Sequence, residues 1–195
     1  TTQIAFVLQD HPPVANLATY TVTETQIASA NAASKFVLQN ILARGNVTDA
    51  DGDTVTVTAI TAPTVNETSA GLSIVSITAE SAGAGEAARY DILTNSGNAH
   101  IAVGSDGQVY LWSDIGDNPF QGLGQNETAT INFSYIVADG FGGGAGATAT
   151  ITINGADDAP VVSGTSSGAV TGAGGGNHGT PGTPAAPLAG IQARP

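Results

Sequence analysis

The sequence contains no cysteine and no methionine, and it has few basic or aromatic residues. Without cysteine the chain can form no disulfide, no thiolate zinc site and no thiol-dependent active site. Its 4 Lys and Arg stand against 16 Asp and Glu, which gives a formal net charge of -12. Because such a charge repels phosphate and attracts divalent cations, we expect neither nucleic acid nor an anionic membrane as a partner.

Long apolar runs are also missing. No run approaches the roughly 20 residues that a transmembrane helix needs, so we expect no direct insertion into a membrane. The chain does not begin with methionine, which indicates a processed or excised chain, as after removal of a signal peptide. With 1 Trp, 4 Tyr and 5 Phe, aromatic anchors are few, so a core must be built from Val, Ile, Leu and Ala.

Threonine, alanine, valine, isoleucine and glycine dominate the sequence, whereas lysine, leucine and glutamate are scarce. β-Branched residues fit pleated strands, and long helices favour the scarcer group. Strands are expected at residues 17–24, 54–60, 72–78, 90–93, 99–103, 108–112, 128–138 and 147–154, and an apolar run of unassigned type lies at 36–42. Many short strands separated by turn residues predict an all-β fold, an antiparallel β-sandwich with little helix.

The chain divides into three parts by composition. Residues 1–13 begin as an apolar segment and end in Asp10-His-Pro-Pro13, which predicts an N-terminal strand or linker. Residues 14–160 carry the predicted strands and form the sandwich. Residues 161–195 consist largely of Gly, Pro, Ser, Thr and Ala, so they bury too little apolar surface to fold and form a flexible tail or linker.

The most informative acidic motif is Asp49-Ala-Asp51-Gly-Asp53, which runs directly into the predicted strand at residues 54–60. Alternate carboxylates in a turning chain can point into one cavity, and Gly52 permits a tight bend. Oxygen ligands at this density suit Ca2+, although the spacing is not that of an EF-hand. A solvated acidic turn is the alternative that this loop alone leaves open.

Further acidic residues flank the last two predicted strands. Together with the Asp49 loop, the stretches VTDADGDTVTVTAI (residues 47–60) and LGQNETATINFSYIVADGFGGGAGATATITINGADDAP (residues 123–160) resemble bacterial VCBS and cadherin-like repeats in order, spacing and strand phase. The resemblance covers most of residues 15–160. It departs from the family pattern at residues 61–100, which match little of it, and the motifs occur only once.

This resemblance implies an Ig-like sandwich that is strung in tandem arrays on large secreted or surface proteins, often adhesins. It implies Ca2+ bound at the junction between consecutive domains, so that a site here could be completed by a neighbouring molecule. The residues that match the family's ligand positions are Asp49, Asp51, Asp53, Glu127, Asp139, Asp157 and Asp158. We therefore expect an extracellular or cell-surface module with a structural or adhesive role and no enzymatic activity. Its expected partners are neighbouring domains or identical subunits, with surface glycans or proteins as further ligands.

Two other functions fit the sequence. The apolar segment at residues 1–9 could add as a strand to a neighbour's sheet, as in a self-assembling filament or surface-layer subunit. Alternatively, Trp112 with the acids Asp114, Asp117 and Glu127 could form a carbohydrate-binding or hydrolytic module.

Overall fold

The computed structural model describes residues 9–156. The chain divides into two units, Thr1–Ala159 and Pro160–Pro195, and the described residues all belong to the first. Several predictions fall outside the described residues, namely residues 1–8 of the strand-exchange segment predicted at residues 1–9, the tail at residues 161–195, and the acidic pair Asp157 and Asp158.

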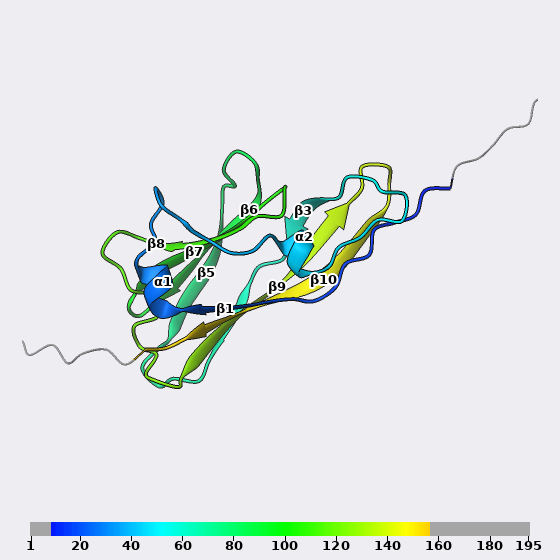
Figure 1. The fold of residues 1–195 in the computed structure, drawn as a ribbon. Helices are drawn as coiled ribbons and strands as arrows, with labels where there is room; N and C mark the ends of the chain where they lie inside the picture. The colour runs from blue at the N-terminus through cyan, green and yellow to red at the C-terminus, as the bar shows by residue number, and fades with distance from the viewer. Residues whose placement is uncertain (1–8, 157–195) are drawn as a thin grey trace, which may run out of the picture. The chain divides into compact units, whose positions relative to one another are not determined.

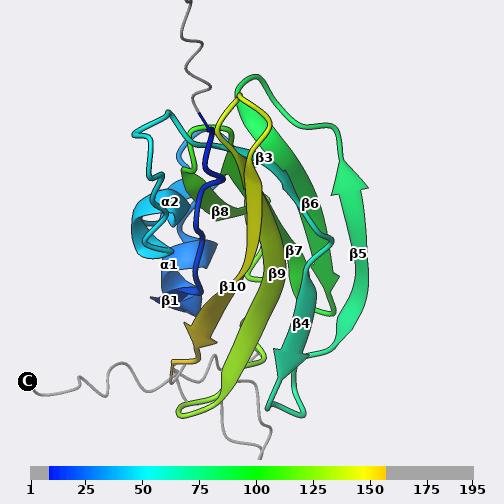
Figure 2. The same ribbon diagram turned by 90° about the vertical axis from the view of Figure 1, so that its right-hand side faces the viewer.

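Residues 9–156 form two five-stranded sheets packed as a sandwich (Figures 1 and 2). The first sheet contains β1 (Ala18–Thr23), β10 (Gly144–Asn154), β9 (Thr128–Ala138) and β3 (Thr56–Ile60), with β4 (Thr64–Glu67) following β3 along the same edge of β9. The second sheet contains β2 (Phe36–Val37), β8 (Val109–Ser113), β7 (Gly97–Gly104), β6 (Glu86–Thr94) and β5 (Ile74–Glu80). The predicted all-β sandwich is confirmed.

One pairing differs from the antiparallel arrangement that the sequence predicts. β1 lies parallel to β10, with Ala18 opposite Ala149 and Thr23 opposite Asn154. Antiparallel neighbours can be joined by a short hairpin, whereas parallel neighbours need a long connection. Here that connection is the remainder of the sandwich, because β1 is the first strand of the described chain and β10 is the last.

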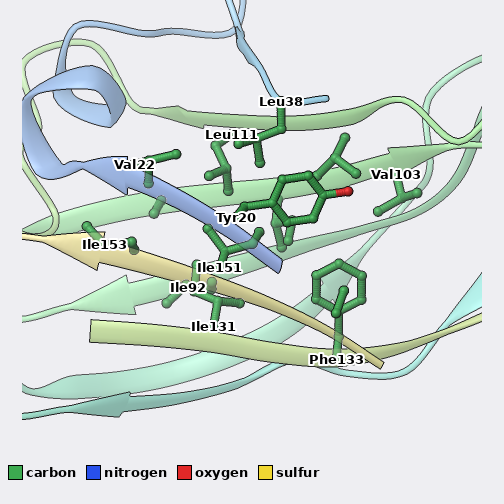
Figure 3. Packing of buried hydrophobic residues seen from close by; sticks show 14 of the residues in the cluster. Tyr20, Val22, Leu38, Ile92, Val103, Leu111, Ile131, Phe133, Ile151 and Ile153 are labelled. Carbon is green, nitrogen blue, oxygen red and sulfur yellow. The ribbon is translucent and has the colours of Figure 1, made fainter. Parts of the chain in front are cut away.

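The core forms between the two sheets from residues that alternate along each strand (Figure 3). On β9 the inward positions are buried and the outward ones are partly exposed, as the period of two requires. Ile131 and Phe133 of β9 and Ile151 of β10 lie in the same cluster as Val103 and Leu111 of the second sheet. The core is built chiefly from aliphatic side chains, as the scarcity of aromatic residues predicts.

Short elements that periodicity did not predict interrupt the strands. The strand expected at residues 17–24 ends at Thr23, where a capping box with Gln26 starts α1 (Glu24–Ala28). The apolar run at residues 36–42 splits into β2 and α2 (Ile41–Arg44), because Asn40 accepts a hydrogen bond from the Leu42 backbone as an N-cap. β4 was also not anticipated.

The directions of the strands determine at which end of the sandwich each loop lies. The segment before β1, the loop before β3 and the β9–β10 hairpin lie at one end, here called the proximal end (residues 9–13, 49–53 and 139–143). Figure 1 shows these three segments side by side, in dark blue, cyan and yellow. The segments after β1, before β9 and after β10 lie at the other, distal end, which includes Glu24, Glu127 and residues 155–156.

Candidate metal centre

The loop before β3 is folded around the side chain of Asp49. Its Oδ1 accepts hydrogen bonds from the backbone N–H groups of Asp51, at 2.9 Å, and Asp53, at 3.2 Å. Gly52 adopts φ 80°, a left-handed conformation that glycine tolerates best. The second oxygen, Oδ2, is buried and has no hydrogen-bond partner. The Asp49 loop is therefore an ordered turn that leaves one carboxylate oxygen available to a ligand.

Asp139, at the end of β9, repeats this arrangement in the β9–β10 hairpin. Its Oδ1 accepts hydrogen bonds from the backbone N–H groups of Phe141, at 2.8 Å, and Gly143, at 3.0 Å. Asp139 is only 4% exposed, and its Oδ2 is buried without a hydrogen-bond partner. A Cβ atom at Gly143 would collide with this oxygen and would lie 2.8 Å from Cα of Pro12. The unpaired oxygen thus lies beside the N-terminal segment.

That segment contributes a residue that the sequence analysis did not select, Asp10. Carboxylate oxygens of Asp10, Asp51 and Asp53 all lie within 4.8 Å of one another. The next residue fixes this position, since the His11 backbone N–H donates to Asp51 Oδ2 at 2.7 Å and its Nδ1 lies 3.1 Å from both Asp51 oxygens. These contacts from His11 lower the pKa of Asp51.

The described part of the N-terminal segment, residues 9–13, therefore lies against the sandwich. Val14 exchanges two backbone hydrogen bonds with Thr48, at 2.8 and 3.0 Å, directly before the Asp49 loop. Pro13 is buried. The predicted boundary at residue 14 consequently separates Asp10 from the domain on which it lies.

The carboxylates of the proximal end repel one another. Desolvation and the charge of Asp139, followed by those of Asp51 and Asp53, raise the pKa of Asp10 above its ordinary value. Desolvation and then Asp49 raise the pKa of Asp53 in the same way, with further contributions from Asp51 and Asp139. A raised carboxyl pKa means that the folded structure disfavours the charged form, so neutral pH destabilises this arrangement unless a cation is bound.

Few cationic groups lie close enough to compensate. Among the described residues, His11 is the only basic side chain that forms an ion pair with these five aspartates. Lys35 and Arg89 both pair with Glu86 instead, at 3.0 and 2.9 Å. The five aspartates, here called the acidic cluster, are Asp10, Asp49, Asp51, Asp53 and Asp139. Such a set of oxygen donors with a deficit of positive charge is suited to a hard divalent cation.

Glu127 is not part of this cluster. It precedes β9 whereas Asp139 follows it, and 11 residues of extended strand separate the two positions, or roughly 36 Å at about 3.3 Å per residue. At the distal end the Glu127 carboxylate accepts a hydrogen bond from the Gly124 N–H at 2.7 Å. The Ser69 hydroxyl and that N–H lower the pKa of Glu127. Of the seven predicted ligands, the structure brings together Asp49, Asp51, Asp53 and Asp139.

Glu24 is a further acidic residue at the distal end, and it lies beside the residues that follow β10. It is buried, and its Oε1 accepts a hydrogen bond from the Ala156 N–H at 3.0 Å. The Gly155 N–H donates to the backbone oxygen of Glu127 at 3.0 Å. The chain thus passes between Glu24 and Glu127 immediately before Asp157 and Asp158, which lie outside the described residues.

The sequence does contain a signal for Asp10. The pattern Asp-x-x-Pro-Val occurs at residues 10–14 and again at residues 157–161. The second occurrence was selected through its match to the family's linker motif, whereas the first was interpreted only as two prolines that interrupt a strand. The repeated pattern marks Asp10 as a position equivalent to Asp157.

Trp112 is not available as a sugar-stacking platform. It is 2% exposed, and His100 stacks on its ring with centroids 4.9 Å apart and planes 8° apart. The Lys35 ammonium lies 4.3 Å from the ring centroid. Asp117 accepts a hydrogen bond from the Asn98 N–H at 2.8 Å. The carbohydrate-binding alternative therefore lacks the exposed aromatic ring on which it depends.

Fold and site together define an all-β sandwich with an acidic cluster at one end. No family model, curated protein or solved structure matches this chain. Among the described residues, no helix is long and apolar enough to span a membrane.

Proposed function

We propose that this chain is a Ca2+-binding, non-enzymatic module of the VCBS or cadherin-like kind, with an Ig-like fold and a structural or adhesive role in an extracellular or cell-surface protein. The observation that carries the proposal is the buried, unpaired Oδ2 of Asp139 beside the carboxylates of Asp10, Asp51 and Asp53. Burying a carboxylate oxygen without a hydrogen bond costs free energy, and an acidic turn that is only solvated would not incur this cost.

Ca2+ in the acidic cluster would connect three segments that are distant in the sequence. Asp10 belongs to the segment that leads into β1, the Asp49 loop leads into β3, and Asp139 closes β9. A cation held by all three would fix the direction in which the N-terminal segment joins the sandwich. Such a joint would stiffen a chain of neighbouring domains, which is the mechanical task of a spacer or adhesin stalk.

The direct test is calorimetric titration of the full chain with Ca2+ after treatment with EDTA. We expect binding with a dissociation constant of about 10⁻⁴ to 10⁻³ M, as for other extracellular Ca2+ modules. Asp139→Asn and Asp51→Asn should weaken this binding. Glu127→Gln, which alters a carboxylate at the distal end, is the matched control and should leave it unchanged. Equal binding by all four proteins, or no binding by the parent, would contradict the proposal.

A further inference from the structure

A second group of metal-ligand residues lies on the outer face of the other sheet. These residues belong to the strands β5, β6 and β7, which are neighbours in that sheet (Figure 2). Asp91 of β6 is directly opposite His100 of β7, and Glu80 of β5 is the diagonal neighbour of Asp91. The three side chains each offer one ligand atom, and these atoms all lie within 4.8 Å of one another. None of the three belongs to the acidic cluster.

The imidazole of His100 is held in one orientation. It is 8% exposed and stacked on Trp112, and its Nε2 lies 3.0 Å from Oδ1 of Asp114. Because a carboxylate only accepts, Nε2 carries the hydrogen of that hydrogen bond. In the neutral ring the lone pair is then on Nδ1. Asp114 thus stands in the relation to His100 that outer carboxylates have to metal-binding histidines, whose tautomer they fix.

The lone pair of Nδ1 faces another acceptor. Nδ1 of His100 and Oδ1 of Asp91 form a close ion-pair contact, and both atoms are buried without a hydrogen bond of normal geometry. The Glu80 carboxyl is the third group, and it is hydrogen-bonded with Asp91. Arg89 lies close enough to influence Glu80, yet its guanidinium is bound to Glu86 at 3.0 Å. Two carboxyl groups and one ring nitrogen therefore converge here, and all three could bind the same metal ion.

We propose that Glu80, Asp91 and His100 bind a transition-metal ion of the Zn2+ class. A ring nitrogen combined with two carboxylates is a ligand set typical of zinc and its neighbours, whereas Ca2+ selects oxygen ligands alone. Three protein ligands leave a fourth position for water or for a donor from another molecule. The site is chemically distinct from the acidic cluster, so this inference stands independently of the Ca2+ proposal.

The fluorescence of Trp112 can serve as an intrinsic probe of metal binding at this site. Trp112 is the only tryptophan, and it is stacked on the proposed ligand His100. The chain has three histidines, of which His11 contacts Asp51 of the acidic cluster and His178 lies outside the described residues. We would therefore titrate the full chain carrying His11→Gln and His178→Gln, saturated with Ca2+, so that His100 is the only imidazole. Zn2+ binding is measured by calorimetry, and Co2+ binding by quenching of Trp112 fluorescence.

We expect one Zn2+ per chain and quenching of Trp112 by Co2+. Asp114→Asn, which removes the charge of the outer partner of His100, should weaken binding by about 10- to 100-fold. The ligand variants Glu80→Gln and Asp91→Asn should weaken it further. Glu67→Gln, an exposed carboxylate of β4 on the other sheet, is the matched control and should bind as the parent does.

Folding of each variant is checked by its melting temperature, and Glu80→Gln is the safest variant because this side chain is exposed. Absence of Zn2+ binding would overturn the proposal. So would equal affinity in Glu80→Gln, Asp91→Asn and the parent, or Co2+ binding that leaves Trp112 fluorescence unchanged. In those cases an imidazolium ion that bridges Asp91 and Asp114 would account for the geometry instead.

Discussion

The effect of Asp139→Asn on the melting temperature should depend on whether Ca2+ is present. Asparagine keeps an oxygen that can accept from the Phe141 and Gly143 backbones, so the hairpin retains its hydrogen bonds. The substitution removes the charge that helps to raise the pKa of Asp10 and Asp53. In EDTA we therefore expect the variant to melt at the same temperature as the parent or at a higher one.

The order should reverse when Ca2+ is added. Ten to a hundred times the dissociation constant of Ca2+ stabilises the folded parent by about 1.4 to 2.7 kcal/mol, because the unfolded chain separates the ligands. For a domain of about 150 residues this corresponds to a rise in melting temperature of about 3 to 11 °C. Asp139→Asn should lose most of this rise, since it removes the charge and the unpaired oxygen that face the ion. Mg2+ should raise the parent's melting temperature less, because it keeps its waters and requires strict octahedral geometry.

Thermal melting followed by circular dichroism measures both effects, with Glu127→Gln as the control that retains the full response to Ca2+. If Asp139→Asn destabilises the protein equally in EDTA and in Ca2+, the carboxylate stabilises only the hairpin. If the parent's melting temperature ignores Ca2+, the acidic cluster is a solvated acidic surface. Either result would refute the reasoning from the unpaired oxygen of Asp139.

Three further predictions follow from the structure. In EDTA, the raised pKa of Asp53 means that the folded state binds a proton more tightly than the unfolded chain does, so the free energy of unfolding should fall as the pH rises above about 4. Asp53→Asn should reduce the dependence of the free energy of unfolding on pH, measured by urea titrations at several pH values. An unchanged pH dependence would exclude the repulsion between Asp53 and the other aspartates. Ile151→Ala should lower the free energy of unfolding by about 2 to 5 kcal/mol, because this side chain is 0% exposed in the core; Ile136→Ala, at an outward position that is 45% exposed, should cost about 1 kcal/mol or less by the same urea titration. A chain that begins at Gln9 keeps Asp10 and should elute from a size-exclusion column as the full chain does; loss of a larger species on this truncation would instead favour the strand-exchange alternative.

The fold could be predicted largely from local pattern, and the prediction failed where contacts are distant. β9 has the bounds that alternation predicts, because each of its residues faces either the core or solvent. The parallel pairing of β1 with β10 could not be predicted in this way, because the local sequence of a strand does not specify which strand it pairs with. The end of β1 at Thr23 was missed for another reason. There a capping box, which is a side-chain feature, takes precedence over an alternating pattern that continues to Glu24.

Four of the five aspartates of the acidic cluster were predicted from the sequence, but the sequence did not separate them from Glu127. Asp49, Asp51 and Asp53 are close in sequence, so a single turn is enough to bring them together. Asp139 and Glu127 both flank the same strand, and sequence proximity to a strand does not tell which end of the sandwich a residue reaches. Only the directions of β3 and β9 decide that Asp139 joins the Asp49 loop and that Glu127 does not.

The residues of the proposed Zn2+ site are brought together by strand register, and their positions in the sequence do not suggest that they are neighbours. In the sequence the three histidines are scattered, and none has a second histidine or a carboxylate at a spacing typical of metal sites. Asp91 and His100 become neighbours because they lie equally far from the turn at Asn95 and Ser96, and the β6–β7 pairing places them opposite each other. The β5–β6 pairing then brings Glu80 alongside them. A shift of either hairpin by one residue would turn one of these side chains to the other face of the sheet, so the ligand set depends on the same register that buries Ile92 and Ile101 in the core.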